Sequence, residues 1–308
     1  MVGAVIGRMF TSLLVVAGSS VLVFVILYLL PGDPVNSLLD PTFATSEQIA
    51  SLRHQLGVDQ PLHVQLADYF GKLLHGDFGN SLLNSEPVLP RILSQFPATL
   101  ALAAASAVVA VVIGVLLGVL SAIHRNKPID VIARIVGLLG ISMPAFWSGI
   151  LLLLVFSIHL GWLPTMGSNG WKTLVLPSIT LGLIGAGFLV RMIRNSMLEV
   201  VNEHFIVTLR SKGLSERSIM YRHALRNALI PAVTMIGMLV GEMLAGAVVI
   251  ETVFARQGIG RIIADAIMAK DLPVVQGVIF FSAIIYVSVN LIVDISYSFI
   301  DPRVRRAT

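Results

Sequence analysis

Six long apolar blocks dominate the chain, and the shorter segments between them hold most of the charged residues. As helices that rise about 1.5 Å per residue, the blocks are long enough to cross about 30 Å of hydrocarbon. Lipid offers no water to free backbone groups, so each block is predicted to be helical. The predicted spans are residues 9–30, 98–123, 135–158, 174–190, 228–250 and 275–300. This pattern is typical of an all-α membrane protein.

Prolines and small residues within these blocks predict how the helices bend and pack. Pro144 and Pro177 are expected to kink or start helices, because proline lacks the N–H that the preceding turn needs. Small residues let helices approach closely, and they recur at Gly114, Gly118, Gly182, Gly185 and Gly187. The first block is too long for a signal-peptide core and no small-residue cleavage site follows it, so we expect a retained span.

Composition supports the membrane class and excludes several others. The 308 residues are 56% hydrophobic and 12% charged, with a mean hydropathy of +0.88. A soluble domain carries about twice that charged fraction. Cysteine is absent, which excludes disulfides, thiolate metal sites and cysteine nucleophiles. The net charge is +4, and the basic residues lie at the ends of spans rather than in one soluble patch. We therefore expect membrane lipid around the chain and no nucleic-acid partner.

The distribution of basic residues predicts the orientation in the membrane. Six spans place both termini on one side, and most of the lysines and arginines then fall on that side. They include Arg8, Arg125, Lys127, Arg194, the basic residues of 210–226, Arg303, Arg305 and Arg306. Because positive residues stay on the inner side of a membrane, both termini are expected in the cytoplasm of a multi-pass protein.

Residues 31–97 form a long segment on the predicted outer side. Ser46 can cap a first short helix that Gly57 ends, and Asp59 with Pro61 can start a second. The apolar stripes of the two helices are Ile49, Leu52 and Leu56, and Leu62, Leu66, Tyr69 and Leu73. Helices this short are not stable alone in water, so a small helical cap is expected. It could be a structural lid or a docking surface for an extracytoplasmic partner.

The most informative segment, about 198–227, lies between the fourth and fifth spans. Asn202 is predicted to cap a short helix in which Phe205 and Leu209 share one face. Gly213 can adopt the left-handed conformation that ends it, and Ser215 can cap a second helix. The predicted product is a helix–glycine–helix elbow at the membrane surface. A generic basic loop is the alternative interpretation of these residues alone.

This elbow resembles the EAA loop in the permease subunits of binding-protein-dependent ATP-binding-cassette (ABC) importers. It is most similar to the dipeptide/oligopeptide and nickel branch, where the loop reads Arg-Ala-Lys-Gly-Leu and then Arg-His-Ala-Leu-Arg-Asn. The chain has Arg210-Ser211-Lys212-Gly213-Leu214 and Arg222-His223-Ala224-Leu225-Arg226-Asn227. Leu209 and Ser211 stand where that branch usually has alanines. The resemblance implies a coupling helix that sits in a groove of a separate ATPase. The predicted coupling residues are Phe205, Thr208, Leu209, Arg210, Ser211, Lys212, Gly213, Ser215, His223 and Leu225.

Other motifs carry the same resemblance along most of the chain. They are Leu30-Pro31-Gly32-Asp33-Pro34, Gly76-Asp77-Phe78-Gly79, Pro144-Ala145-Phe146-Trp147, Gly161-Trp162-Leu163-Pro164, Glu251-Thr252-Val253-Phe254 and Asp301-Pro302-Arg303. Gln257 replaces a proline usual in the branch. The resemblance implies the type I ABC importer permease fold. Its expected parts are the first transmembrane helix with the extracytoplasmic cap, 1–97, and a five-helix permease domain with the coupling loop, 98–308.

The chain has no Gly-x-x-x-x-Gly-Lys-Ser/Thr loop, so it cannot cradle the phosphates of ATP by that means. We therefore expect a transporter subunit that is not itself an enzyme, without catalytic residues, metal site or cofactor of its own. The resemblance implies a second related permease subunit, an extracytoplasmic substrate-binding protein, and two ATPase subunits that bind ATP and Mg²⁺. It also implies a bacterial or archaeal plasma membrane.

Two acids fall within predicted spans, where charge is costly and functional roles are frequent. Glu242 lies near the middle of the fifth span and Asp294 toward the predicted cytoplasmic end of the sixth. Glu242 could line the substrate path and meet a substrate amino group, or it could be a hydrogen-bonded packing residue. Asp294 is expected to be structural.

The cargo implied by the resemblance is a short peptide, a dipeptide or an oligopeptide. Nickel, glutathione or another peptide-sized cargo are alternatives within the same importer class. An ion-coupled secondary transporter would have paired broken helices and more ionisable residues at mid-membrane. An intramembrane protease would need His-Glu-x-x-His or a serine with a positioned base, and neither pattern occurs.

Overall fold

The computed structural model describes residues 2–29, scattered positions between 45 and 54, and residues 59–300. Side chains are described over 7–29, at those scattered positions and over 59–293. The caps predicted for the first cap helix, Ser46 and Gly57, lie outside the described residues, as do the motifs at 30–34 and 301–303 and the side chain of Asp294.

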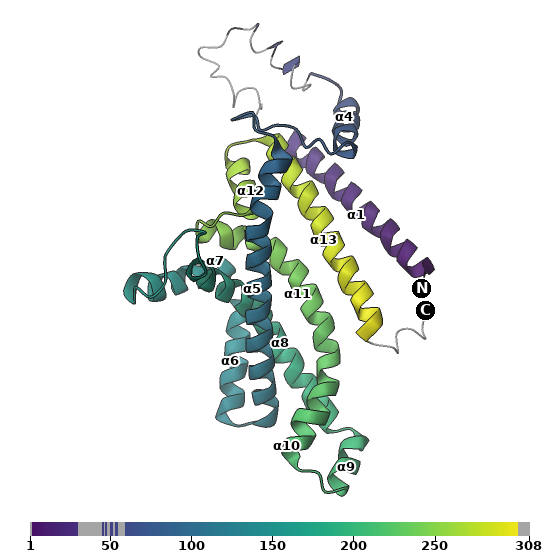
Figure 1. Ribbon diagram of the computed structural model, residues 1–308, viewed down its shortest axis with the longest axis vertical. Coiled ribbons are helices and arrows are strands. Elements are labelled where there is room, and N and C mark those ends of the chain that lie inside the picture. The colour runs from purple at the N-terminus through teal and green to yellow at the C-terminus, as the bar shows by residue number, and fades with distance from the viewer. Residues whose placement is uncertain are drawn as a thin grey trace. The chain divides into compact units, whose positions relative to one another are not determined.

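The regular elements of the described residues are helices, apart from one bridge between Asn80 and Pro87 (Figure 1). They are α1 (Val2–Leu29), α4 (Leu62–Leu74), α5 (Val88–Ile123), α6 (Pro128–Ser142), α7 (Ala145–Leu152), the π-helix η1 (Leu153–His159), α8 (Lys172–Val201), α9 (His204–Ser211), α10 (Glu216–Ser218), the π-helix η2 (Ile219–Ala224), α11 (Leu225–Val253), α12 (Ile259–Met268) and α13 (Leu272–Ile300). The predicted all-α class is confirmed.

Five stretches of the described residues are long and apolar enough to cross a membrane as continuous helices. They are Gly7–Leu29, Val88–Ile123, Lys172–Val201, Glu216–Val253 and Leu272–Val293. Each contains or overlaps a predicted span, so the helices expected there are confirmed. Pro177 lies within α8 without ending it, and Pro97 lies within α5 in the same way.

The third predicted span, 135–158, is bent rather than continuous, and the kink or helix start expected at Pro144 is confirmed. The chain forms two helices, Pro128–Ser142 and Ala145–His159, with a bend of 114° between them. Pro144 directly precedes α7 and disfavours helical geometry at Met143, which is extended with φ −84° and ψ 129°. The bent pair counts as a sixth span only if both helices together cross the membrane.

The chain divides into two compact units. The N-terminal unit comprises Met1–Pro97 and Gly258–Ser288, and the core unit comprises Ala98–Gln257 and Val289–Thr308. Residues 258–288 thus group with the first 97 residues, whereas the sequence ranges 1–97 and 98–308 assign them to the second part.

In the core unit, glycines bring helices into backbone contact. A Cβ added to Gly140 of α6 would lie 2.4 Å from the Leu183 carbonyl oxygen of α8, and one added to Gly187 would lie 2.4 Å from that of Gly137. Between α5 and α8, a Cβ on Gly114 would collide with Leu189. The close helix approach predicted from the small residues is confirmed, and α8 is the helix to which α5 and α6 both pack.

In the N-terminal unit, the predicted second helix of the segment 31–97 is present as α4. Tyr69 of its apolar stripe stacks on Phe24 of α1 with ring centroids 5.6 Å apart, and Leu73 is buried. Beyond α4, the Ser81 hydroxyl donates to the carboxylate of Asp271, which also accepts from the Leu82 N–H at 3.0 Å. These bonds fix the turn before α5 to the start of α13.

Candidate functional site

The elbow predicted between the fourth and fifth spans is present. Helix α8 ends at Val201 and α9 begins at His204, after an extended residue, Glu203, with φ −72° and ψ 148°. The predicted N-cap, Asn202, is wrong by one position. Asn202 is instead the C-cap residue that follows α8, and its side-chain amide donates to the Leu198 carbonyl oxygen at 2.9 Å. The chain therefore changes direction at Glu203, without a side-chain cap.

The turn between α9 and α10 has the geometry that the sequence predicts. Gly213 has φ +77°, and its N–H donates to the carbonyl of Arg210 at 2.9 Å. The N–H of Leu214 donates to the carbonyl of Leu209 at 3.3 Å, which completes a Schellman motif. Ser215 is extended, and its hydroxyl accepts the N–H of Ser218 at 3.4 Å, so it caps α10. Backbone geometry thus sets the bend of the elbow.

The inner face of the elbow is fixed to the hydrophobic core of the core unit. Ile206, Ile219 and Ala224 are fully buried in that core. Leu209, Leu214 and Leu225 are partly buried and pack against it. The structure therefore places Leu209 and Leu225, two of the predicted coupling residues, among the groups that attach the elbow to the bundle.

The rest of the α9 surface is exposed and partly apolar. Phe205 retains 41% and Val207 56% of its accessible surface. The predicted coupling residues Thr208, Arg210, Ser211, Lys212, Gly213 and Ser215 are also exposed, and His223 is half-buried. Exposed apolar side chains beside a basic flank are the features that a protein partner would bury. Most of the predicted coupling residues are thus exposed, and we call the exposed part of α9 with the following turn the outer face of the elbow.

An ion pair that sequence reasoning missed crosses this turn. Arg210 Nε lies 2.6 Å from Glu216 Oε1, and its Nη2 lies 3.2 Å from Oε2. The carboxylate raises the pKa of Arg210. Both side chains are exposed, so the pair contributes little stability, and its two parallel bonds join the last turn of α9 to α10 across Gly213. Opposite charges on the two sides of Gly213 are the sequence signal that could have indicated it.

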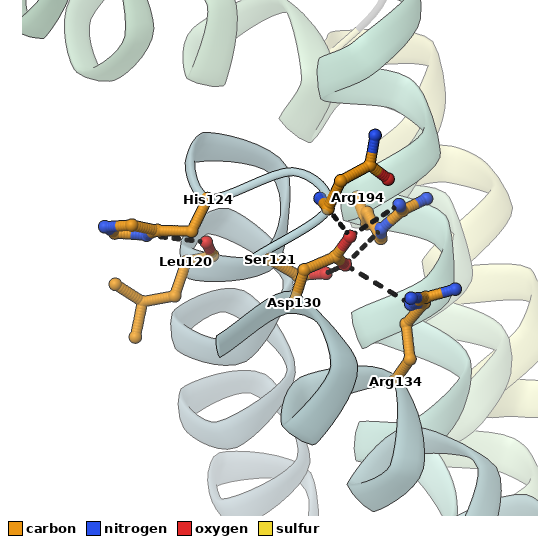
Figure 2. Close-up of polar contacts among 7 residues, drawn as sticks. Leu120, Ser121, His124, Asp130, Arg134 and Arg194 are labelled. Atoms are coloured by element: carbon orange, nitrogen blue, oxygen red, sulfur yellow. Dashed lines mark hydrogen bonds and ion pairs between the residues drawn. The ribbon is translucent and has the colours of Figure 1, made fainter. Parts of the chain in front are cut away.

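A second polar cluster joins three helices of the core unit (Figure 2). The carboxylate of Asp130 in α6 is fully buried and accepts from Arg194 of α8, with Nε at 2.8 Å and Nη2 at 3.0 Å. The Ser121 hydroxyl of α5 and the Asn126 N–H also donate to it. Figure 2 shows Arg134 on the same carboxylate. By sequence, Arg194 is one of the basic residues that flank the predicted spans, and no local pattern distinguishes Asp130.

The acids of α11 differ in their surroundings. Glu242 is exposed along the helix. Glu251 is fully buried, and its Oε1 accepts the Thr99 hydroxyl of α5 at 2.6 Å. Arg256 is also buried, and burial lowers its pKa while the negative charge of Glu251 opposes that shift. Glu251 is thus part of the packing of the core unit, whereas Glu242 is available to a ligand or a partner.

A cavity of about 190 Å³ lies at the bend between α6 and α7. It is lined by Val136, Leu139, Gly140, Met143, Ser148, Thr180, Leu183 and Ile184, and Glu242 is not among them. In the part of the chain that the structure describes, no three His, Asp or Glu side chains come together as a metal site would require.

Comparison with known proteins decides the family. Residues 114–306 match the family model described as "Binding-protein-dependent transport system inner membrane component", and residues 1–103 match its N-terminal counterpart. The chain belongs to this family. It is therefore a multi-pass inner-membrane permease subunit of an ABC importer, as the resemblance of the elbow predicts.

Curated relatives support this membership over nearly the whole permease chain. The glutathione transport system permease protein GsiC of Salmonella typhimurium strain LT2 is 42% identical over 294 residues, which cover 96% of this chain and 95% of the relative. GsiC of Escherichia coli strain K12 is 40% identical over 286 residues, 93% of each chain.

Solved structures establish the fold of the permease. Two structures of inward-facing conformations of the MetNI methionine ABC transporter match with TM-scores of 0.57 and 0.60. The identities are 19% and 20%, and each match covers 70% of this chain and 99% of the other. The type I ABC importer permease fold predicted by resemblance is confirmed.

Proposed function

We propose that this permease imports glutathione or a short peptide of similar size, driven by ATP that partner subunits hydrolyse. Its partners would be a second related permease, two ATPase subunits that bind ATP and Mg²⁺, and an extracytoplasmic binding protein. The chain itself contributes no ATPase site. Similarity to GsiC supports a cargo of this size, and the outer face of the elbow is the observation that supports the ATPase partner.

The elbow is suited to transmit a displacement from a partner to the bundle because its exposed and buried sides differ. Phe205 and Val207 offer exposed apolar surface that a groove could bury, and Lys212 at the end of the same helix is also exposed. Ile206 and Ile219 fix the other side of the elbow to the hydrophobic core. A displacement of the outer face would therefore move the bundle, because packed cores resist continuous deformation. Two permease bundles would then rock between inward-facing and outward-facing states.

The orientation proposed for the permease in the membrane follows from the positive-inside rule. With both termini in the cytoplasm, the elbow would lie on the cytoplasmic side, where ATP is available, and residues 31–97 would lie on the opposite side. The segment that contains α4 would then face the binding protein.

Glu242 is proposed to face the substrate path. Its exposure on the apolar helix α11 leaves its carboxylate able to meet the amino group of a peptide. In reconstituted vesicles, Glu242→Gln is expected to reduce uptake at limiting cargo while basal ATP hydrolysis and assembly stay unchanged. Wild-type uptake under those conditions would remove Glu242 from the path.

The proposed function is tested by purifying the tagged permease with its partners and reconstituting the complex in liposomes. A related permease and ATPase polypeptides should co-purify. Labelled glutathione and a labelled dipeptide are each supplied with the binding protein. At least one of them should accumulate, and only when Mg²⁺-ATP is present on the ATPase side. Uptake driven by an ion gradient without ATP would contradict the proposal and favour a secondary transporter.

A further inference from the structure

The carboxylate of Asp130 is held by donors from three parts of the core unit. Ser121 donates from α5, the Asn126 N–H from the loop before α6, and Arg194 donates two bonds from α8, at 2.8 and 3.0 Å. Asp130 has no exposed surface, and the Arg194 side chain retains 17%. Asp130 is therefore a point at which α5, α6 and α8 are joined by polar bonds.

We call Asp130 with its donors Ser121, Asn126 and Arg194 the joint. The bonds of this joint are directional, whereas the apolar packing around it is not. A buried charge is tolerated only when it is paired and hydrogen-bonded, and apolar residues of similar volume would stabilise a bundle at least as well. Two parallel bonds between a guanidinium and a carboxylate fix both distance and angle. Apolar packing is not directional, whereas the bonds of this pair specify one register and one rotation of α8 against α6.

The joint lies close to the elbow along the chain. Arg194 precedes the end of α8 at Val201 by seven residues, or about 10 Å of helix. Met197 is fully buried between them, in the same hydrophobic core that contains Ile206 of the elbow. At the neighbouring contact, a Cβ on Gly118 of α5 would lie 2.9 Å from the Cβ of Ile193. Helix α8 is thus attached to α5 and α6 just before it leads into α9.

We propose that Asp130 and Arg194 are positioning residues for energy coupling, which make the α5–α6 hairpin follow α8 when the elbow is displaced. This inference rests on the proposed function of the elbow. When the joint is weakened, α8 slips against α6, so the ATPases complete their cycle while less cargo crosses the membrane. The quantity that the joint controls is cargo imported per ATP hydrolysed.

The test measures uptake and ATP hydrolysis in the same vesicles with the complete complex. Asp130→Asn is expected to lower cargo imported per ATP by at least about fivefold, because fivefold is the smallest factor to which typical coupling free energies correspond. ATP hydrolysis should remain. Arg194→Lys keeps the charge but loses the paired geometry, so an intermediate ratio is expected.

Arg134→Gln is the matched control, because Arg134 contacts the same carboxylate at 3.4 Å but its side chain is 53% exposed. It should keep the wild-type ratio. The double variant Asp130→Asn with Arg194→Gln removes the charge of both partners, so neither is left buried and unpaired. It should assemble and still show the lowered ratio.

The outcomes separate the inference from the proposed function. Absence of ATP-driven uptake in the wild-type complex would refute the proposed function. With that uptake present, a wild-type ratio in the double variant and in Arg194→Lys would overturn the role of the joint. An equal fall of uptake and ATP hydrolysis in these variants would also overturn it, because it would show a structural role alone.

Discussion

Replacement of Gly213 by proline is expected to abolish ATP-driven uptake, whereas Gly213→Asn is expected to retain most of it. Gly213 has φ +77°, and proline is confined to about −65°, so the turn cannot form. Proline also removes the N–H that donates to the Arg210 carbonyl at 2.9 Å. Asparagine tolerates the left-handed region better than most residues, and no atom lies within 4 Å of its added Cβ.

The comparison of the two variants isolates the bend of the elbow. Both introduce a side chain at the same exposed position, so they differ in backbone conformation and in the lost N–H donor rather than in steric fit to the bundle. Uptake and ATP hydrolysis would be measured on complexes matched for the amount of permease incorporated. Equal uptake by Gly213→Pro and wild type would show that the bend plays no part in coupling.

The parts of the fold that depend on local sequence could be predicted. The continuous apolar runs indicate the helices α5 and α11, and the glycines of α8 indicate close packing. Gly213 and Ser215 could be assigned because a left-handed turn and a hydroxyl cap each require particular residue types at one position. The resemblance of the elbow then indicated the family.

The errors arose where the decisive interaction is not visible in a local pattern. A kink or helix start was expected at Pro144 and at Pro177 alike, but only Pro144 lies at a bend, of 114°, whereas proline within α8 and α5 does not end the helix. Hydropathy alone therefore cannot tell a proline that ends a helix from one within it. The cap of α9 was misplaced at Asn202 because the chain turns at Glu203 through its backbone, without a side-chain bond.

Contacts between distant residues were out of reach for sequence reasoning. Asp130 and Arg194 are 64 positions apart, and Ser81 and Asp271 are 190 apart, so no spacing rule links them. The inward position of Leu209 has a similar cause. Its helix carries apolar residues at 205, 206, 207 and 209, and only the packed bundle determines which of them are buried.

Direct contact between the outer face of the elbow and an ATPase can be measured because the chain contains no cysteine. A single Phe205→Cys, labelled with a thiol-directed photocrosslinker, is expected to join the permease to an ATPase subunit in the purified complex. Phe205 is 41% exposed, so the label can reach a partner. The labelled Val207→Cys is expected to give the same crosslink to an ATPase subunit.

Two controls define the specificity of this crosslink. Ile206→Cys has a fully buried position and should not take the label. Leu74→Cys in α4 is 85% exposed and should take the label, yet it lies in the segment predicted on the opposite side of the membrane and should give no ATPase product.

Crosslinking from Phe205 therefore shows whether the outer face of the elbow lies against an ATPase, as energy coupling through the elbow requires. We predict an ATPase adduct on most labelled chains from Phe205→Cys and Val207→Cys, and none from Leu74→Cys. An active complex in which the labelled Phe205→Cys and Val207→Cys gave no ATPase adduct would contradict the central claim.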